Sequence, residues 1–198
     1  NCITWNILAT GFTNFNKGVV DKNDGETFDD MSLRYANVIR ILAVIINAND
    51  MDFICLQEVD PLFYELLKEL DFFSENFGLI YHKNVLLNSY KFKAFNLIMY
   101  RKNKWNLHRK FFLKITDQHH ITQNKTRSNM PKRAQIAITA HFKNNDGEDI
   151  NIVNTKLSGV EDRLDIRLDE LRNIMDKIAS KGKTMIMGDF NETDFESI

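Results

Sequence analysis

The stretch that decides the fold lies near the carboxyl end of the chain: Thr184–Glu192, with the sequence TMIMGDFNE. Its first four residues form a short, mainly apolar run that stops at Gly188 and is followed by a carboxylate, Asp189, and an amide, Asn191. A short apolar run bounded by Gly and polar residues is typical of a buried strand that leads into a polar loop. We therefore predict a strand over Thr184–Met187 with polar side chains at its end.

Three earlier stretches have the same design, an apolar strand-like run followed by polar side chains. Residues 2–5 lead to Asn6, residues 53–56 lead to Gln57 and Glu58, and residues 150–153 lead to Asn154, Thr155 and Lys156. In open α/β sheets, ligands bind outside the carboxyl ends of the strands. We therefore expect the four strand ends to contribute to one shared site built from hard oxygen ligands. A single polar residue at a strand end is more often a turn former or a helix cap, so this prediction depends on all four ends together.

Hydrophobic periodicity and turn residues predict the other elements of the first half of the chain. A polar loop is expected over Thr10–Asp30, followed by a helix over Ser32–Asn47 whose apolar residues recur three and four apart. Asp60-Pro61 is a typical helix start, with Asp as the N-cap and Pro in the first turn. This second helix is expected over Leu62–Leu70.

Strands and one further helix are predicted for the rest of the chain. The strands are expected over Phe77–Tyr81, Phe95–Tyr100, Leu107–Ile115, Ala134–Phe142 and Asp149–Thr155, with a hairpin turn at Asn144–Gly147. Ser158–Glu161 has the spacing of a capping box before a helix that ends at Gly182. The inner stripe of this helix is predicted to be Leu164, Leu168, Leu171, Met175 and Ile178. Antiparallel pairs combined with βα units indicate a layered α/β domain.

The composition is that of an ordinary globular protein, with 198 residues, 43% of them hydrophobic and 27% charged. No uninterrupted apolar run approaches the roughly 18 residues that span a bilayer, so we predict no transmembrane segment. Cys2 and Cys55 lie in apolar strand-like runs where reduced thiols are expected, which favours an intracellular protein, cytoplasmic or nuclear. The chain opens without an initiator Met or a signal-peptide pattern, so targeting signals are not visible in this segment.

A basic segment interrupts the otherwise balanced charge of the chain. Residues 101–133 contain ten Lys and Arg residues against one acid, Asp117. Such a cluster predicts a phosphate-rich partner, and the alternative is a solvated loop and edge strand. The candidates for steering nucleic acid are Arg101, Lys102, Arg109, Lys110 and Arg127. Trp105, Phe111 and Phe112 offer faces for base stacking, with core packing as the alternative role.

The polar residues at the strand ends suit a magnesium-dependent phosphodiesterase. Mg²⁺ prefers carboxylate oxygen, keeps several waters and binds through one or two protein carboxylates and substrate phosphate. Glu58 is the expected ligand of Mg²⁺, with Mn²⁺ as an alternative metal, and Asp189 is expected to orient or deprotonate the attacking water. Asn6 and Asn191 are expected to donate amide hydrogens to phosphate or to fix neighbouring groups. The sequence has no zinc-type Cys/His cluster, nucleotide-binding Gly-rich motif or serine-hydrolase motif.

Three motifs resemble, in order and spacing, those of the endonuclease/exonuclease/phosphatase superfamily. They are Trp5–Ala9 (WNILA), Asp52–Asp60 (DFICLQEVD) and Gly188–Asn191 (GDFN). The first two are most similar to the forms found in the deadenylase and nocturnin-like branch. The resemblance covers nearly the whole chain and implies a four-layer α/β sandwich, with two packed mixed β-sheets flanked by helices. It also implies divalent-metal-dependent hydrolysis of phosphate esters.

The same branch has segments similar to Arg133–Ala137 and Asn154–Leu157, and to the positions of Arg167 and Glu170. The resemblance therefore implies that Lys156, Asn154 and Arg133 bind substrate phosphate. The family usually has His where this chain has Lys156. A Lys with an ordinary pKa of about 10.4 is a poor proton donor or acceptor at pH 7, so we expect Lys156 to hold phosphate by its charge.

A second departure concerns the end of the domain. Family members continue past Gly-Asp-Phe-Asn to a late Asp and a closing Ser-Asp-His, and this sequence stops at Ile198 without either. We therefore expect residues 1–198 to form a single domain of this type that is truncated before the final strands. The polypeptide as given is then expected to lack a complete active site.

The leading prediction is a Mg²⁺-dependent phosphodiesterase or nuclease that acts on an RNA 3′ end or on a nucleotide phosphate, with RNA favoured over DNA. One alternative is a catalytically degenerate member that binds RNA or a protein partner through Lys156 and the basic segment. Another is an inositol-phosphate or lipid phosphatase of the same fold, since a basic surface suits both kinds of phosphate.

Overall fold

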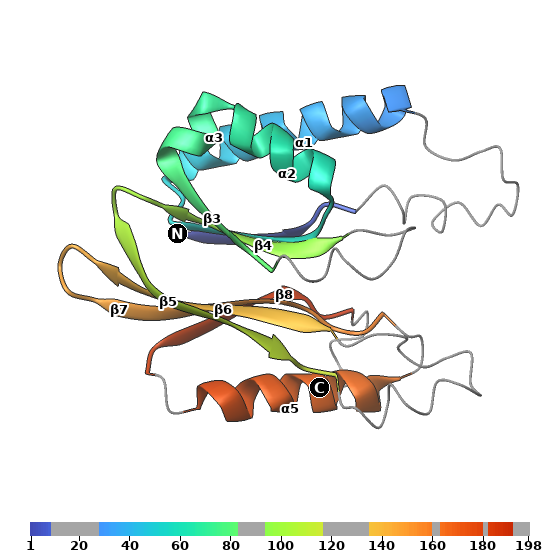
Figure 1. Cartoon of the computed structure of the whole chain (residues 1–198), viewed down its shortest axis with the longest axis vertical. Helices are drawn as coiled ribbons and strands as arrows, with labels where there is room; N and C mark the ends of the chain where they lie inside the picture. Colours follow the sequence, from blue (N-terminus) through green and yellow to red (C-terminus); the bar gives the residue numbers. More distant parts are fainter. Residues whose placement is uncertain (9–27, 83–93, 117–134, 160–162, 180–181, 192–198) are drawn as a thin grey trace, which may run out of the picture. The chain divides into compact units, whose positions relative to one another are not determined.

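The computed structural model describes residues 1–8, 28–82, 94–116, 135–159, 163–179 and 182–191. Contacts within the chain divide it into two compact units, residues 1–104 (unit 1) and 105–198 (unit 2). Each unit holds one four-stranded β-sheet with helix on one of its faces (Figure 1). The predicted α/β fold class, two mixed sheets flanked by helices, is confirmed. A single domain over residues 1–198 stays a prediction.

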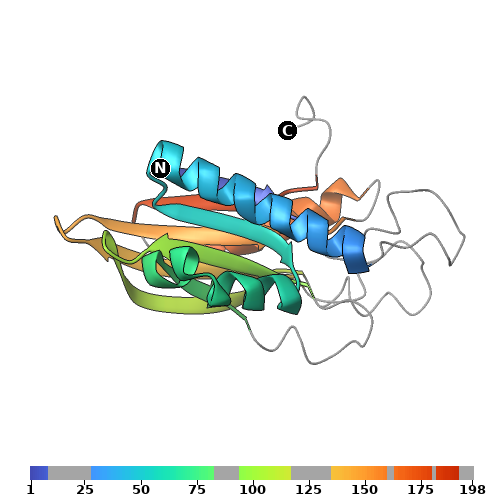
Figure 2. The same ribbon diagram turned by 90° about the horizontal axis from the view of Figure 1, so that it is seen from above.

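In its described residues, unit 1 is a mixed sheet with three helices on one face. Its strands are β1 (Cys2–Asn6), β2 (Phe53–Val59), β3 (Phe77–Tyr81) and β4 (Phe95–Arg101), in the spatial order β1-β2-β4-β3. Strand β1 runs parallel to β2, and the other neighbours are antiparallel. Seen from above, α1 (Phe28–Asn49) lies beside α2 (Pro61–Glu69) and α3 (Asp71–Asn76) over the sheet (Figure 2).

Helix α1 buries one stripe of residues spaced three and four apart. The buried residues are Met31, Tyr35, Val38, Leu42 and Ile46, and they belong to the same hydrophobic core as residues of β2 and β4. Among the described helices, α1 alone is long and apolar enough to cross a membrane, although a core helix passes the same test. The buried stripe accounts for part of this apolar character. The absence of a transmembrane segment stays a prediction.

Helix α1 begins earlier than predicted. It starts at Phe28, so residues 28–30 of the expected polar loop belong to the helix; residues 9–27 lie outside the described residues. Asp29 and Asp30 occupy its first turn, where negative side chains are favoured by the positive end of the helix dipole. The prediction treated these acids as loop formers and therefore placed the helix start too late.

Helix α2 begins as the sequence predicted. Asp60 is its N-cap, and the Oδ1 atom of Asp60 accepts a hydrogen bond from the backbone N–H of Phe63 at 2.9 Å. The other carboxylate oxygen accepts the hydroxyl of Tyr35, which lies on α1. One side chain therefore caps α2 and ties it to α1. The short helix α3, which follows directly, was not predicted.

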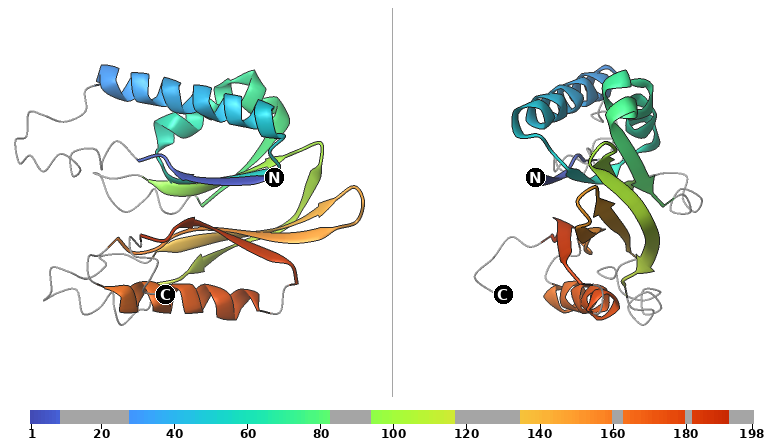
Figure 3. Two further views of the ribbon diagram at one scale, coloured as in Figure 1. Left: turned by 180° about the vertical axis from the view of Figure 1, so that it is seen from behind. Right: turned by 90° about the vertical axis from the view of Figure 1, so that its left-hand side faces the viewer.

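As far as the structure describes it, unit 2 is a second mixed sheet with one long helix on its face. Its strands are β5 (Trp105–Lys114), β6 (Ile136–Asn144), β7 (Asp149–Lys156) and β8 (Thr184–Asp189), in that spatial order. The first three are antiparallel neighbours, and β7 runs parallel to β8. Helix α5 (Leu164–Ile178) connects β7 to β8 and lies along one face of the sheet (Figure 3).

The predicted strands are present within a few residues of the expected bounds. The turn between β6 and β7 is also confirmed: Gly147 has a φ of 85° and donates its N–H to the carbonyl of Asn144 at 3.2 Å. A positive φ at this position favours Gly, which is why Asp-Gly is a strong hairpin signal.

The predicted inner stripe of α5 is wrong in part. The buried residues are Ile166, Arg167, Glu170, Ile174 and Ile178, whereas Met175 is 50% exposed. The prediction counted apolar residues only, and this helix buries two charged side chains. The capping box is also wrong, because α5 begins at Leu164 without a side-chain cap at Arg163. Ser158 makes other hydrogen bonds instead.

Candidate active site

In unit 1, the predicted site residues lie at the shared carboxyl end of two parallel strands. Asn6 of β1 is the register partner of Gln57 of β2, so both strands end at the same edge of the sheet. The side-chain amide of Asn6 donates a hydrogen bond to Oε1 of Glu58 at 3.0 Å, and its Oδ1 accepts the N–H of Leu8 at 3.0 Å. Asn6 therefore orients the Glu58 carboxylate, which is 6% exposed.

Gln57 has a structural role at this edge. Its amide nitrogen donates to Oγ1 of Thr4 at 2.9 Å and to the carbonyl of Cys55 at 3.1 Å. Asp60, two residues past Glu58, caps α2. Gln57 and Asp60 thus have the structural role that is common for polar residues at strand ends. Glu58 is held by Asn6 and serves neither as an N-cap nor in the regular strand pairing.

Backbone strain marks the same strand ends. In the described residues, the non-glycine residues with positive φ are Leu8 (56°), Asp50 (46°), Glu58 (56°) and Asn191 (50°). Glu58 and Asn191 are themselves predicted site residues, and Leu8 lies two residues after Asn6. Glu58 also falls where the pairing of β2 with β4 is irregular, between Leu56 and Val59. Left-handed backbone costs about 1–3 kcal/mol in a non-glycine residue and is found preferentially at functional sites.

In unit 2, the end of β8 meets the end of β7 in the same way. Lys156 is the register partner of Asp189, and the backbone N–H of Leu157 donates to the carbonyl of Asp189 at 2.9 Å. The ammonium of Lys156 lies 3.9 Å from Oδ2 of Asp189. The other carboxylate oxygen of Asp189 accepts the N–H of Asn191 at 3.0 Å. The carboxylate of Asp189 is therefore held between the ammonium of Lys156 and the backbone N–H of Asn191.

Asn154 and Asn191 complete this second group. Asn154 is fully buried in β7, with an exposed fraction of 0%. The side-chain amide of Asn191 donates to the carbonyl of Leu157 at 2.6 Å. This hydrogen bond ties the residues that follow β8 to the residues that follow β7, so the two polar strand ends are fixed to each other.

Burial lowers the pKa of the Lys156 ammonium below its usual value, and the negative charge of Asp189 offsets only part of this effect. The side chain of Lys156 is 21% exposed. The expectation of an ordinary pKa for Lys156 is therefore corrected. Desolvation disfavours the charged form of an amine, so the direction of the shift follows from the burial of Lys156.

The close contact between β7 and β8 explains why the residue before Asp189 is Gly188. A Cβ atom on Gly188 would lie 2.1 Å from the carbonyl oxygen of Thr155 on the neighbouring strand. Only Gly therefore fits between β7 and β8 at this point. The close approach keeps Asp189 in register with Lys156.

The predicted steering residues divide into two groups, and Arg127 and Arg133 lie outside the described residues. Arg101 donates to the carbonyl of Met51 at 3.1 Å and lies over the ring of Phe77, and Lys102 donates to the carbonyl of Ser74 at 2.7 Å. These two cations contact other parts of unit 1. Arg109 and Lys110 are exposed on β5, the edge strand of the unit 2 sheet. Trp105, Phe111 and Phe112 on β5 are partly buried.

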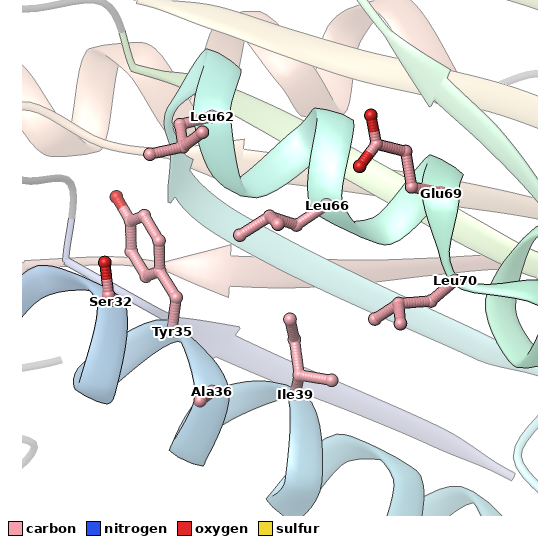
Figure 4. Close-up of a pocket in the computed structure, with 8 residues that line it drawn as sticks. All are labelled: Ser32, Tyr35, Ala36, Ile39, Leu62, Leu66, Glu69 and Leu70. Atoms are coloured by element: carbon pink, nitrogen blue, oxygen red, sulfur yellow. The ribbon is translucent and has the colours of Figure 1, made fainter.

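A hollow of about 430 Å³ lies between α1 and α2 (Figure 4). Its wall is mainly apolar, with Ile39, Leu62 and Leu66 among the lining residues and Glu69 as an acid on its edge. None of its described lining residues is a predicted site residue. The candidate site residues of each unit are therefore those at its strand ends.

The donor set of these residues fits Mg²⁺ better than it fits zinc. In the parts of the chain that the structure describes, no three His, Cys, Asp or Glu side chains form a metal-binding group. Mg²⁺ needs fewer protein ligands, because it keeps its waters and shares substrate phosphate. A single oriented carboxylate, Glu58, suits that requirement.

Unit 2 contains a polar network that was not predicted from the sequence. Glu170, on the buried face of α5, accepts hydrogen bonds from Ser158 and from Thr116. The available signal was the position of Glu170 four residues from both Ile166 and Ile174, which places a carboxylate on an apolar stripe. A charged residue at such a position requires partners.

Comparison with protein families identifies the fold. The model of the Endonuclease/Exonuclease/phosphatase family matches residues 3–197. The chain belongs to this family. No curated protein matches the chain significantly.

Several solved structures have a similar fold. ANGEL2, a 2′,3′-cyclic phosphatase in complex with adenosine-2′,3′-vanadate, is 18% identical with a TM-score of 0.71, over 98% of this chain and 54% of that one. TDP2 of D. rerio, complexed with single-strand DNA product, is 18% identical with a TM-score of 0.64, over 98% of this chain and 62% of that one. The human Nocturnin catalytic domain with bound sulfate is 18% identical with a TM-score of 0.62, over 96% of this chain and 64% of that one.

The family match confirms the resemblance to this superfamily that the sequence predicted. ANGEL2 and Nocturnin are among the similar structures, and at this identity they show the fold alone. The chain spans 54–64% of the length of these three chains.

Proposed function

We propose that this protein is a divalent-metal-dependent phosphoesterase that cleaves an RNA 3′ end or a nucleotide phosphate. The observation that carries the proposal is the state of Glu58: a nearly buried carboxylate, oriented by Asn6 and held on left-handed backbone at a strand end. Strain of this kind persists only where the surrounding structure enforces it, and it is concentrated at functional sites.

Glu58 is the residue that would hold the metal, Mg²⁺ or Mn²⁺. When bound, such a metal neutralises phosphate oxygen and stabilises the leaving alkoxide. Asn6 keeps the Glu58 carboxylate oriented by donating to Oε1, and a fixed orientation suits a metal ligand. Both residues lie in unit 1 and act together through this hydrogen bond.

In unit 2, Asp189 is proposed to orient and deprotonate the attacking water. Its carboxylate is fixed by Asn191 and accompanied by Lys156, so it is preorganised as a base. Asn191 is proposed to donate to the phosphate, and Asn154 to support that strand end. Lys156 supplies positive charge in place of the family's usual His, and its partial burial strengthens the attraction to phosphate.

The relatives of known structure support a phosphate-ester substrate. TDP2 is complexed with a single-strand DNA product, ANGEL2 with adenosine-2′,3′-vanadate, and Nocturnin with a sulfate anion. RNA is proposed in preference to DNA on the resemblance to the nocturnin-like branch, and the exposed Arg109 and Lys110 would steer a polyanion toward the protein.

The test is hydrolysis of a labelled adenosine-rich RNA and of a nucleotide phosphate by the full-length protein, with Mg²⁺, with Mn²⁺ and with EDTA. Glu58→Gln and Asp189→Asn are expected to lower kcat by about 10²-fold or more, because each removes a charge needed in the transition state. Glu65→Gln is the matched control, since Glu65 pairs with Lys68 on the surface of α2. Its activity should equal that of the wild type.

A second candidate function rests on Lys156, which replaces a His and pairs with Asp189. A degenerate member would bind RNA through such cations without cutting it. RNA that is bound but left intact in every metal condition would overturn the enzyme proposal and support this one. If RNA is neither cut nor bound, both RNA proposals fail, and inositol phosphates become the next substrates to assay.

A further inference from the structure

Glu170 is a buried carboxylate that joins two loops of unit 2. Its exposed fraction is 0%. Its Oε1 accepts hydrogen bonds from the hydroxyl of Thr116 at 2.5 Å and from the hydroxyl of Ser158 at 2.6 Å, and its Oε2 accepts the backbone N–H of Ser158 at 2.7 Å. Thr116 follows β5 and Ser158 follows β7, so one side chain of α5 holds the ends of two strands.

The direction of these hydrogen bonds suits a carboxylate. Thr116 Oγ1 accepts the backbone N–H of Gln135, just before β6, at 2.8 Å, so its hydroxyl hydrogen is available for Glu170. An apolar side chain would pack between Ile166 and Ile174 without the cost of burying a charge. The presence of a carboxylate here is explained by the three donors that it organises.

The loop fixed by Glu170 contacts a candidate catalytic residue. The turn Leu157–Gly159 lies against Asn191 at two points: the carbonyl of Leu157 accepts the side-chain amide of Asn191 at 2.6 Å, and a Cβ atom on Gly159 would lie 3.3 Å from Oδ1 of Asn191. Ser158, the residue between these two points, is the one that Glu170 holds. Three residues thus connect α5 to the candidate site.

We propose that Glu170 is a positioning residue: its buried carboxylate fixes the turn Leu157–Gly159 and, through this turn, the side-chain amide of Asn191. The proposal rests on the proposed function in so far as Asn191 acts on phosphate. The positional link itself is a property of the folded chain.

The positional link is tested by NMR of the side-chain amide of Asn191 in the full-length protein. In the wild type this amide is hydrogen-bonded to the carbonyl of Leu157, so its two proton signals should be well separated and slow to exchange. Glu170→Ala should collapse the separation and speed exchange. Glu170→Gln should preserve both, because its carbonyl can accept from Ser158 N–H and its amide can donate to the two hydroxyls.

The matched control is Phe142→Leu on β6. Phe142 is fully buried in unit 2 and pairs with Ile150 near the start of β7, at the other end of this strand from the turn, so this variant lowers the melting temperature and leaves the hydrogen bonds of the turn in place. Its Asn191 signals should equal those of the wild type. Equal changes in Phe142→Leu and Glu170→Ala would overturn the proposal, because general destabilisation would then explain both. If Glu170→Ala does not fold, Ser158→Ala replaces it, since it removes one of the three hydrogen bonds to Glu170 and should shift the same signals.

The kinetic arm uses a double-mutant cycle. Glu170→Ala is expected to lower kcat by about 10²-fold, the effect of misplacing a reacting group by about 1 Å, with KM unchanged. Asn191→Gly removes the side chain without backbone strain, because Gly accepts the positive φ of this position. In that background Glu170→Ala should have little further effect on kcat, since the group that it positions is gone.

Multiplicative effects on kcat would mean that Glu170 acts independently of Asn191 and would overturn the proposal. A wild-type protein that hydrolyses no phosphate ester would refute the proposed function alone. The NMR comparison would then decide on the link between Glu170 and Asn191, so the two failures are distinguishable.

Discussion

At the scale of single residues, one side chain of the candidate site, Lys156, is expected to serve function at a cost in folding stability. Lys156 is partly buried, and the pKa of its ammonium is lowered because burial disfavours the charge more than Asp189 favours it. A charge held under such conditions destabilises the folded state and is retained where function needs it. Lys156 therefore allows the two contributions to be measured in one variant.

We predict that Lys156→Met raises the melting temperature and lowers activity. Met keeps the length of the side chain and removes the buried charge, and a chain of this size gains about 2–4 °C for each kcal/mol of stability. Hydrolysis should fall by about 10²-fold, because the charge that attracts the phosphate is lost. Thermal unfolding and kcat/KM, measured on the same preparation, check both parts.

The stability gained by Lys156→Met should depend on pH in a defined direction. The folded-state pKa of Lys156 lies below the unfolded value, so the unfolded chain binds more protons between the two values, and the penalty is fully present below the folded-state pKa. It disappears as the pH rises past the ordinary value of 10.5. The advantage of Lys156→Met should therefore be largest below the folded-state pKa of Lys156 and shrink as the pH rises from there to 10.5. Lys177→Met, at an exposed position of α5, should show neither effect, and a gain that does not vary with pH would contradict the assignment.

At the scale of elements, the close approach of β7 and β8 makes a second prediction. Gly188→Ala should destabilise unit 2 by about 2–3 kcal/mol and lower activity with it, because the new Cβ would lie 2.1 Å from a backbone carbonyl that cannot move without breaking the sheet. Denaturant unfolding measures the loss. Gly182→Ala is the control, since no atom lies within 4 Å of a Cβ there and only the positive φ of 77° opposes it, which costs about 1 kcal/mol. Equal losses in the two variants would show that the approach at Gly188 is not the cause.

The same elements show what could be predicted from sequence. Strands that end in Asn6, Glu58, Lys156 and Asp189 were recognisable because apolar runs stop at polar residues within a few positions. The N-cap at Asp60 was recognisable because capping chemistry is local.

Non-local features were beyond prediction. The inner stripe of α5 was misplaced because Glu170 is buried by hydrogen bonds to loops that lie far from it in the sequence. Ser158 matched a local capping pattern, yet its hydrogen-bond partner lies 12 residues away. The left-handed backbone of Glu58 leaves no sequence signal either, since Glu is not a residue that favours positive φ.

At the scale of the whole molecule, the net charge of −1 provides no overall attraction for nucleic acid. Any steering must come from the local arrangement of cations. Of the predicted steering residues that the structure describes, Arg101 and Lys102 are engaged with Met51, Phe77 and Ser74. Arg109 and Lys110 instead stand exposed on an edge strand. Charges on an edge strand also prevent edge-to-edge pairing, which is the structural alternative to steering.

We predict that the double substitution Arg109→Ala/Lys110→Ala weakens RNA binding and reduces its salt dependence. Each phosphate contact on a single strand contributes a slope of about −0.7 to the plot of log K against log salt, so losing two contacts should flatten the slope by about 1.4. Lys102→Ala/Lys104→Ala removes the same charge from positions that contact Ser74 and Asp52, and it should leave the slope unchanged. Equal flattening by both pairs would assign the effect to net charge rather than to a binding surface. An unchanged slope for Arg109→Ala/Lys110→Ala would assign these two cations to protection of the sheet edge.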